Sequence, residues 1–300
     1  MKTITVFSPA KINLFLAVTG RREDGYHDLV SVAAPVDWGD SVTIEPRLPA
    51  PGQPPEFSLE CNDPAVPRDG TNLVLKAAAA FRAATRWRSG ARFVLEKKVP
   101  MGAGLGGGSS NAVAALRGLN ELAARPLDAA GLAGIASQVG SDCALFLPRV
   151  PVVMRGRGER VEPLPAGAAA RLRGRKVLIF KPDFPVSTAW AYERIAARAG
   201  YLALAQAEAR LGAWIADPAA PAEGLLFNNL EAPVFEKHVA LPALAAELSA
   251  RFGLKVLMSG SGSSCFALLP LQGEAPLEAL ASAIRAAWGP SAAVVETALR

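Results

Sequence analysis

The sequence predicts an α+β fold in two parts, and three observations support that prediction. The chain has 300 residues, which is long for a single hydrophobic core. Segments with the two-residue alternation of strands occur along it together with segments that have the spacing of amphipathic helices. A stretch rich in proline and glycine, residues 148–174, lies near the middle. We therefore expect an N-terminal domain over residues 1–165 and a C-terminal domain over residues 166–300.

The first third of the chain predicts strands and one helix. The strands expected from apolar alternation cover residues 3–7, 12–18, 41–45 and 91–99. Ser8-Pro9-Ala10 separates the first two strands, and the turn-like Trp38-Gly39-Asp40 precedes the third. Residues 72–85 are rich in alanine and predict a helix capped by Thr71 or Asn72.

The remainder of the chain predicts further elements of both kinds. The expected helices cover Ala129–Val139, 188–199, 202–215, 243–252 and Leu277–Trp288. The expected strands cover Lys176–Lys181, 255–258, 265–269 and 293–297. The first of these helices ends in the turn Gly140-Ser141-Asp142.

Composition narrows the class of protein. Half of the residues are hydrophobic (51%), yet no stretch approaches the roughly 20 apolar residues of a membrane helix. The N-terminal segment lacks the pattern of a signal peptide. The three cysteines have no CxxC pairing and fit a reducing cytoplasm. Only His27 and His238 are available to a histidine-based metal site, so none is expected.

Charge adds one further expectation. The formal charge of +5 is modest, and basic residues are interspersed with acids, which gives weak support for nucleic-acid binding. We expect a cytoplasmic monomer or weak homodimer without a nucleic-acid or membrane partner.

A glycine-rich loop between a strand and a helix is the most specific feature of the sequence. Its glycines leave the backbone free to adopt positive φ and to approach a ligand closely; they are Gly102, Gly104, Gly106, Gly107 and Gly108. Ser109, Ser110 and Asn111 are residues of the kind that cap helices, at the point where helical spacing begins. Unpaired N–H groups and the positive end of the helix dipole meet there. The loop therefore predicts a binding site for the phosphates of a nucleotide, ATP in particular.

Two better-known phosphate loops do not match this sequence. A Walker A loop needs Lys after its last glycine, and here Ser109 follows Gly108. A dinucleotide fingerprint needs an acidic residue at the end of a second strand, whereas Glu121 falls late in the helix itself.

Three segments together resemble the motifs of the GHMP kinases, the superfamily of galactokinase, homoserine kinase and mevalonate kinase. They are the segment 8–14 (SPAKINL), the glycine loop 100–111 and the segment 258–264 (MSGSGSS). More narrowly, PAKINLFL, DGYH at 24–27, GLGGGSSNA and GSD at 140–142 are similar to the 4-diphosphocytidyl-2-C-methyl-D-erythritol kinases of that superfamily. The resemblance extends from Ser8 to about Leu268.

This resemblance implies a fold, a reaction and a nucleotide site. The fold is an N-terminal α/β ATP-binding domain followed by a C-terminal ferredoxin-like domain. The reaction is phosphorylation of the 2-hydroxyl of a cytidine diphosphate derivative, with ATP and Mg²⁺. The residues expected at ATP are Asn72, Leu73, Pro100, Gly102, Gly104, Leu105, Gly106, Gly107, Gly108, Ser109, Ser110, Asn111, Gly260, Ser261 and Gly262.

Two charged residues are the candidates for catalysis. Asp142 follows a Gly-Ser turn at a helix end, where a carboxylate can accept the proton of the acceptor hydroxyl. Lys11 lies in a mostly apolar strand and would pair with Asp142 and orient that hydroxyl. Phosphoryl transfer asks mainly for positioning, so Asp142 acts either as the base or as an orienting group.

The resemblance also implies an acceptor pocket. Its residues would be Asn13, Tyr26, His27, Thr188 and Tyr192, with the aromatic rings against the cytosine. Members of this family commonly carry Phe at the position of Ala33 and Val-Pro at Cys143-Ala144, so this sequence departs from them there.

The sequence leaves the Mg²⁺ contacts and the exact function open. Ser109, Ser110 or a nearby acidic residue are candidates to contact Mg²⁺. A GHMP kinase that acts on another alcohol, or a nucleotide-binding regulator without catalysis, would share the glycine loop.

Overall fold

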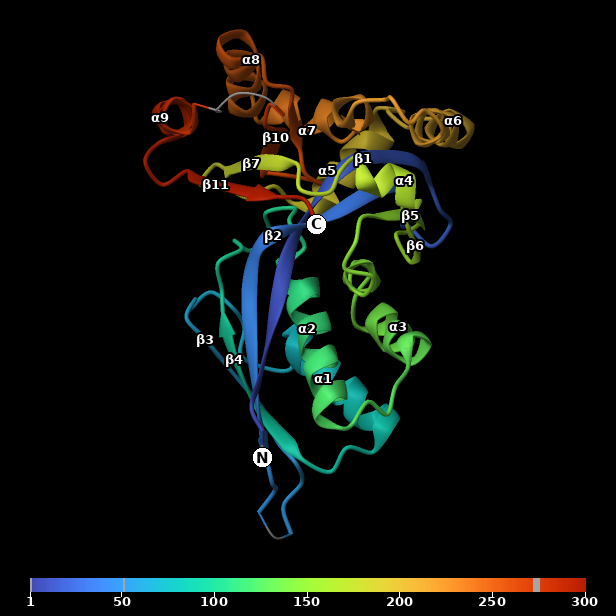
Figure 1. Ribbon diagram of the computed structural model, residues 1–300, viewed down its shortest axis with the longest axis vertical. Coiled ribbons are helices and arrows are strands. Elements are labelled where there is room, and N and C mark those ends of the chain that lie inside the picture. The colour runs from blue at the N-terminus through green and yellow to red at the C-terminus, as the bar shows by residue number, and fades with distance from the viewer. Residues whose placement is uncertain (1, 51, 272–275) are drawn as a thin grey trace. The chain divides into compact units, whose positions relative to one another are not determined.

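The computed structural model describes residues 2–50, 52–271 and 276–300, and the chain forms two compact units (Figure 1). The first unit comprises Met1–Ala10, Trp38–Met101 and Gly106–Arg149. The second comprises Lys11–Asp37, Gly102–Leu105 and Val150–Arg300. Both contain helices and strands, which confirms the α+β class. The domain limits expected at residues 165 and 166 stay a prediction.

Two long strands, β1 (Ile4–Arg21) and β2 (His27–Arg47), contribute residues to both units. The predictions of a break at Ser8-Pro9-Ala10 and of a turn at Trp38-Gly39-Asp40 were therefore wrong. In the first unit, a Cβ added to Gly39 would lie 2.1 Å from the carbonyl oxygen of Ser8 and 2.7 Å from Pro9 Cα. Gly39 is thus required for close approach of two strands, and the pairing keeps both strands extended through residues that favour turns elsewhere.

The first unit combines strands with helices. The second half of β2 pairs antiparallel with β4 (Gly90–Glu96), which pairs in parallel with β3 (Phe57–Cys61). Helices α1 (Leu73–Thr85), α2 (Gly107–Leu122) and α3 (Ala129–Val139) pack against one another (Figure 1). A 3-10 turn, Ala144–Phe146, follows α3. Among the described residues of this unit, the fully buried core includes Ile44, Phe81, Phe93 and Leu116.

The starts of two helices in this unit differ in how they are capped. Asn72 caps α1, as expected, because its side chain accepts the N–H of Val74 at 2.9 Å. Helix α2 begins earlier than expected, with Gly106 as its N-cap at φ +68°. The prediction that Ser109, Ser110 and Asn111 cap this helix was wrong, because all three lie inside its first two turns. A left-handed glycine starts the helix before these side chains are reached.

The second unit contains a small set of paired strands that the sequence did not predict. β1 pairs in parallel with β8 (Phe227–Asn228), and the first half of β2 pairs antiparallel with β5 (Val152–Gly156). β5 forms a hairpin with β6 (Arg160–Pro163), followed by the short helix α4 (Ala166–Ala170). The stretch rich in proline and glycine thus carries regular structure.

The second unit also contains a four-stranded antiparallel sheet in the order β11-β7-β10-β9. Its strands are β7 (Lys176–Lys181), β9 (Val256–Met258), β10 (Cys265–Leu268) and β11 (Ala293–Ala298). Numbered within this sheet, the order is 4-1-3-2, which with helices after the first and third strands is the ferredoxin-like arrangement. The predicted strand–loop–strand at residues 255–269 is its β9–β10 hairpin, in which β9 is the edge strand.

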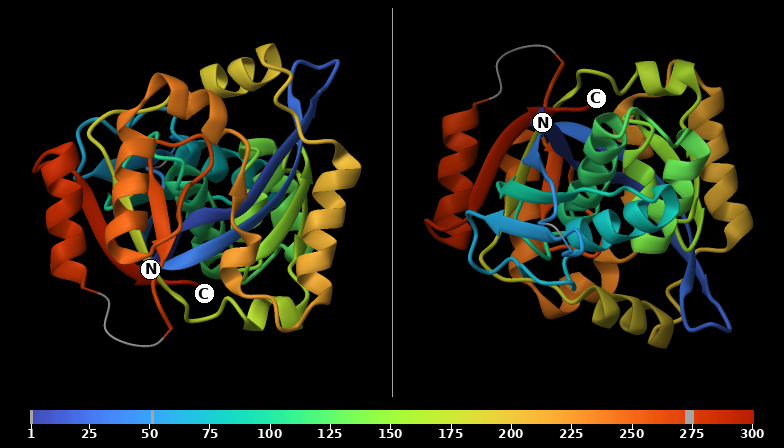
Figure 2. Two further views of the ribbon diagram at one scale, coloured as in Figure 1. Left: turned by 90° about the horizontal axis from the view of Figure 1, so that it is seen from above. Right: turned by 90° about the horizontal axis from the view of Figure 1, so that it is seen from below.

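Helices complete the second unit. They are α5 (Thr188–Ala197), α6 (Leu204–Ala216), the 3-10 turn Ala222–Leu225, α7 (Glu231–Lys237), α8 (Ala240–Phe252) and α9 (Leu277–Trp288). Figure 2 shows α8 and α9 beside this sheet, and the indole N–H of Trp288 donates to the Ala240 carbonyl at 3.0 Å. Trp288 also packs on Phe180 of β7, with ring centroids 5.5 Å apart. Within the described ranges, no helix has the length and apolar character needed to cross a membrane.

Candidate active site

The first part of the glycine loop is held from two directions within the second unit. Gly102 and Gly104 have φ of +62° and +75°, which agrees with the expectation that glycines of this loop adopt positive φ. The Gly104 carbonyl accepts the Lys11 ammonium at 2.8 Å and the Ser259 hydroxyl at 3.1 Å. A Cβ on Gly104 would lie 2.2 Å from the Ser259 carbonyl oxygen. Glycine is therefore needed at 104 both for its φ and for close packing.

The second glycine-serine segment, residues 259–264, lies against this part of the loop. The N–H of Ser264 donates to the Ala103 carbonyl at 3.3 Å. The Asn228 amide donates to the Met258 and Gly260 carbonyls, each at 2.8 Å, and so fixes the start of the segment. Two motifs that are far apart in the sequence thus meet in one unit.

Lys11 and Asn13 form a buried polar pair on β1. The Lys11 ammonium donates to Asn13 Oδ1 at 2.5 Å, and only 4% of Lys11 is exposed. The Asn13 amide nitrogen donates to the Ser31 hydroxyl at 2.9 Å, and that hydroxyl donates to the Phe15 carbonyl at 2.7 Å. This chain of donors sets the orientation of the Asn13 amide with its oxygen toward Lys11. The ammonium is thereby fixed beside the glycine loop, where it can act on a bound polar group.

Three aromatic side chains gather near the start of β2. The ring centroid of His27 lies 5.1 Å from that of Tyr192 on α5 and 6.0 Å from that of Tyr201. Burial lowers the pKa of His27, so its imidazole is neutral at pH 7. His27 Nε2 and the Tyr201 hydroxyl are buried without a hydrogen-bond partner among the described residues. This is the kind of surface that a planar base with polar edges would complete. No motif of the sequence pointed to Tyr201.

Other members of the expected acceptor pocket occupy different surroundings. The Thr188 and Ser261 hydroxyls are hydrogen-bonded at 2.8 Å, which joins the start of α5 to the second glycine-serine segment. Tyr26 is 59% exposed, and the guanidinium of Arg157 lies 4.9 Å from its ring. Ala33 is fully buried on β2 opposite Val152 of β5. The role of Tyr26 and Thr188 toward an acceptor stays a prediction.

In the first unit, the start of α2 has the features of an anion site. No side chain caps the helix, and its first N–H groups have no partner within the helix. A Cβ on Gly108 would meet only Leu73 Cδ1, at 3.9 Å, so the backbone is accessible there. The glycines and the dipole of this helix therefore suit the phosphates of ATP. The contacts of Gly106, Gly107, Gly108 and Ser109 with a nucleotide stay predictions.

Several side chains predicted at ATP already have partners in this unit. The Asn72 side chain caps α1 and also donates to the Pro67 carbonyl at 2.7 Å. Ser110 and Asn111 are 1% and 2% exposed, and both contact Ser8. Their direct contact with ATP stays a prediction, and their observed contacts lie within the first unit.

Asp142 lies in the turn that follows α3, also in the first unit. The N–H of Cys143 donates to the Gly140 carbonyl at 3.0 Å and closes this turn. Burial raises the pKa of the Cys143 thiol to about 11, so this residue stays a neutral thiol at pH 7. The pairing of Asp142 with Lys11 stays a prediction. No group of three or more His, Cys, Asp or Glu side chains suited to a metal occurs in the part of the chain that the structure describes.

Comparison with known proteins agrees with this geometry. Residues 72–147 match the GHMP kinases N terminal domain. A 4-diphosphocytidyl-2-C-methyl-D-erythritol kinase of Methylacidiphilum infernorum is 41% identical over 88% of this chain and 86% of its own length. A crystal structure of 4-(cytidine 5'-diphospho)-2C-methyl-D-erythritol kinase has a TM-score of 0.74 and 34% identity, covering 98% of this chain and 99% of its own.

A more distant structure shares the fold. Homoserine kinase from Cytophaga hutchinsonii has a TM-score of 0.74 at 20% identity, covering 100% of this chain and 96% of its own. Its lower sequence identity separates it from the previous two proteins, which are 41% and 34% identical to this chain. This chain therefore belongs to the 4-diphosphocytidyl-2-C-methyl-D-erythritol kinase family of the GHMP kinases.

Proposed function

We propose that this protein transfers the γ-phosphoryl group of ATP to the 2-hydroxyl of 4-diphosphocytidyl-2-C-methyl-D-erythritol, a step in non-mevalonate isoprenoid precursor synthesis. The relatives at 35–41% identity carry the name of this kinase. The observation on this chain that carries the proposal is the buried Lys11 ammonium, bonded to Asn13 and to the carbonyl of Gly104 in the glycine loop. This arrangement fixes a cation next to the loop that a nucleotide would occupy.

The reaction asks chiefly for positioning and for stabilisation of charge. The first N–H groups of α2 would bind phosphate oxygens, helped by the helix dipole. Asp142 would accept the hydrogen bond of the acceptor hydroxyl and, as the oxygen–phosphorus bond forms, take its proton. Lys11 would orient the same hydroxyl. The leaving group is ADP, so the bond that breaks joins the β,γ-bridging oxygen to the γ-phosphorus.

Mg²⁺ is the second cofactor that we propose, since it neutralises phosphate charge in phosphoryl transfer. The serine hydroxyls at the start of α2 suit a hard cation that keeps several waters and bridges phosphates. Ser110 accepts the hydroxyl of Ser8 at 2.9 Å. Ser109, Ser110 and a nearby acidic residue remain the candidates.

The acceptor's base is proposed to bind at the aromatic group of His27 and Tyr192. Their rings are 5.1 Å apart and inclined by 45°, so each offers a face or edge to a planar ligand. The buried Nε2 of a neutral His27 can exchange one hydrogen bond with a polar edge of the base. We also propose functional domains over residues 1–165 and 166–300, and a cytoplasmic monomer or weak homodimer.

An ATP-consumption assay tests this function. The protein is incubated with MgATP and, in parallel, with 4-diphosphocytidyl-2-C-methyl-D-erythritol, homoserine and mevalonate. We expect ADP formation with the first acceptor alone, and ³¹P NMR should locate the new phosphate on the 2-hydroxyl. Turnover of another acceptor without turnover of the first would contradict the proposed substrate. Binding of ATP without turnover of any of the three would indicate a different acceptor or a regulator.

A further inference from the structure

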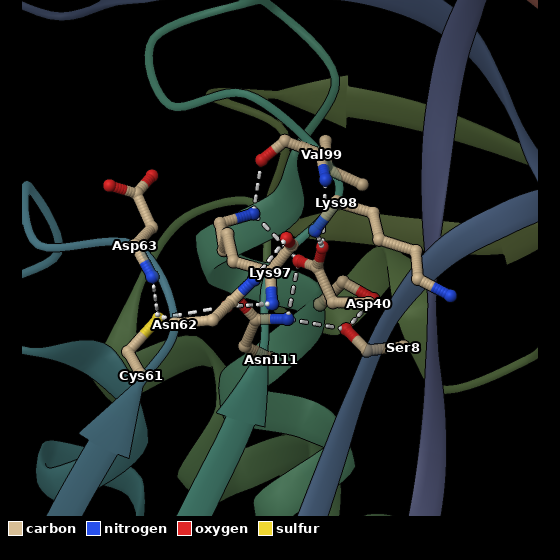
Figure 3. Close-up of polar contacts among 10 residues, drawn as sticks. Ser8, Asp40, Cys61, Asn62, Asp63, Lys97, Lys98, Val99 and Asn111 are labelled. Atoms are coloured by element: carbon tan, nitrogen blue, oxygen red, sulfur yellow. Dashed lines mark hydrogen bonds and ion pairs between the residues drawn. The ribbon is translucent and has the colours of Figure 1, made fainter.

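A buried carboxylate, Asp40, lies in the first unit and contacts Lys97, Lys98, Val99 and Asn111 (Figure 3). Its side chain is 0% exposed and accepts four hydrogen bonds. Two come from the backbone N–H groups of Lys98, at 2.6 Å, and Val99, at 2.8 Å. The others come from the Lys97 ammonium, at 2.7 Å, and the Asn111 amide, at 2.8 Å. A buried charge with this many partners is stabilised in one geometry, and losing any partner is costly.

The partners of Asp40 stand at the two ends of the glycine loop. Residues 97–99 come directly before the non-helical part of the glycine loop, residues 100–106, and Asn111 lies in the second turn of the helix that follows this part. One side chain therefore ties the entry of the loop to its exit. The loop between them contains Gly102, Gly104 and Gly106, whose conformational freedom is the largest of any residue type. Fixing both ends lowers the entropy that such a loop loses when it binds a ligand.

Further contacts tie each end to its surroundings. At the exit, the Asn111 amide also donates to the Ser8 hydroxyl at 2.8 Å, and Ser8 donates to the Ser110 hydroxyl at 2.9 Å. At the entry, Asn62 accepts the N–H of Lys97 at 2.7 Å and donates to the Lys97 carbonyl at 3.1 Å. The loop ends are thus bonded to β1, to β2 and to the segment after β3, as Figure 3 shows for the labelled side chains.

Lys97 brings a positive charge to the start of α2. Its ammonium lies 2.9 Å from the place where a Cβ on Gly107 would be, and it also donates to the Val99 carbonyl. A cation there is unfavourable for the helix dipole, and Asp40 offsets it. The pair as a whole carries no net charge, so it leaves the field of the helix available to an anion.

We infer that Asp40 is a positioning residue for ATP, which acts by holding both ends of the glycine loop through Lys97, the backbone at 98–99 and Asn111. It does not touch the nucleotide, and the inference rests on the proposed binding of ATP at this loop. It also assigns the side chain of Asn111, which donates to Asp40, to support of the loop.

The variant Asp40→Asn distinguishes anchoring of the loop from a purely electrostatic role, because the two predict opposite changes in the affinity for ATP. Asparagine has the same shape, but its amide group would face the donors of Lys97 or Asn111 and break the tie. It also removes a negative charge below the phosphate site. If charge were the only role of Asp40, this variant would bind ATP more tightly. If anchoring is the role, we expect binding to weaken by roughly tenfold, the scale of one buried hydrogen-bond pair.

The experiment measures the Kd of a non-hydrolysable ATP analogue with Mg²⁺ by calorimetry, together with steady-state kinetics. We expect a higher Kd and ATP KM in Asp40→Asn, with kcat at saturating ATP and the acceptor KM within about twofold of the original protein. A merely structural defect would lower kcat and the fraction of active protein, and it would not raise the Kd and the ATP KM selectively. An unchanged or lower Kd for the analogue would overturn the inference.

Two further variants complete the design. Asp37→Asn is the matched control, because Asp37 is on the same strand but is exposed and paired with Arg300 at 2.7 Å. Its Kd should not change, and a comparable rise would overturn the assignment to Asp40. Ser8→Ala removes the two hydrogen bonds between Ser8 and α2 and keeps the Asp40 contacts, so we expect the Kd to rise by roughly threefold. Should Asp40→Asn not fold, an unchanged Kd in Ser8→Ala overturns the inference. Because analogue binding needs no acceptor, these results are independent of whether the proposed substrate is correct.

Discussion

Replacing Gly104 by alanine perturbs the contact between the two glycine-serine segments, and Gly102→Ala provides the matched comparison. Both residues have positive φ, so each alanine pays a backbone cost of about 1–2 kcal/mol. Around Gly102 an added Cβ would meet no atom within 4 Å. At Gly104 it would lie 2.2 Å from the Ser259 carbonyl oxygen, so one of the two segments must move. Overpacking of this kind costs a further 1–3 kcal/mol, roughly.

We therefore expect Gly104→Ala to be less stable than Gly102→Ala by about 1–3 kcal/mol, or several degrees in Tm. Movement of residue 104 would also displace the carbonyl that accepts the Lys11 ammonium at 2.8 Å. For this reason kcat should fall in Gly104→Ala by roughly tenfold more than in Gly102→Ala. Thermal unfolding and steady-state kinetics at saturating ATP measure both effects. Equal Tm and equal kcat in the two variants would refute the close packing of Gly104 on Ser259.

Three other predictions concern the chemistry, the acceptor pocket and the pH dependence of stability. Asp142→Asn should lower kcat by about 10²-fold or more with little change in ATP KM, the usual scale for a positioned base; an unchanged kcat would remove Asp142 from the reaction. Tyr192→Ala should raise the acceptor KM by roughly fivefold, through a stacking loss of about 1 kcal/mol, and a change confined to the ATP KM would contradict its place in the pocket. Burial raises the pKa of Glu231 to about 7, while the N–H of Met258 at 2.8 Å and the charge of Lys255 oppose this rise. Since the native state favours the protonated form, its contribution to stability is complete below about pH 4.5 and is lost as the pH rises to 7. Relative to Glu231→Gln, which keeps the acceptor, the original protein should lose up to about 3 kcal/mol across this window. Denaturant unfolding at several pH values measures the difference, and parallel curves for the two proteins would show that Glu231 does not titrate there.

Local patterns located many of the elements because their ends carry strong signals. Helix α3 was predicted to the residue, since Asp128 accepts the N–H of Gly131 at its start and a Gly-Ser turn follows its end. Strand β7 and helix α9 were likewise located from a short apolar run and from helical spacing. In such segments the information is contained within about a dozen neighbouring residues.

Other elements depend on pairing between distant segments, and local sequence patterns did not predict them. Pro9 and Gly39 favour turns in isolation, but in the first unit the close approach of their backbones keeps β1 and β2 extended. The two-residue strand β8 exists only because Phe227 and Asn228 pair with β1. Strand pairing of this kind is set by tertiary contacts, which outweigh local propensity.

In the candidate site, too, motifs identified some residues, and only the tertiary structure identified others. Lys11, Gly104 and the segment 259–264 were found from motifs, and the structure brings them together in the second unit. Asp40 and Tyr201 belong to no motif. Asp40 was assigned to a turn, because nothing near it in the sequence shows that its partners are Lys97 and Asn111.

The sequence by itself determined that this chain has a glycine loop ahead of a helix and a family of kinases to which its motifs belong. Those features depend on backbone freedom and on residue order, which are local properties. Only the tertiary structure decided which side chains of that loop are available to a ligand. Ser110 and Asn111 face buried partners because hydrogen bonds inside a protein must be satisfied, and those partners come from strands distant in the sequence.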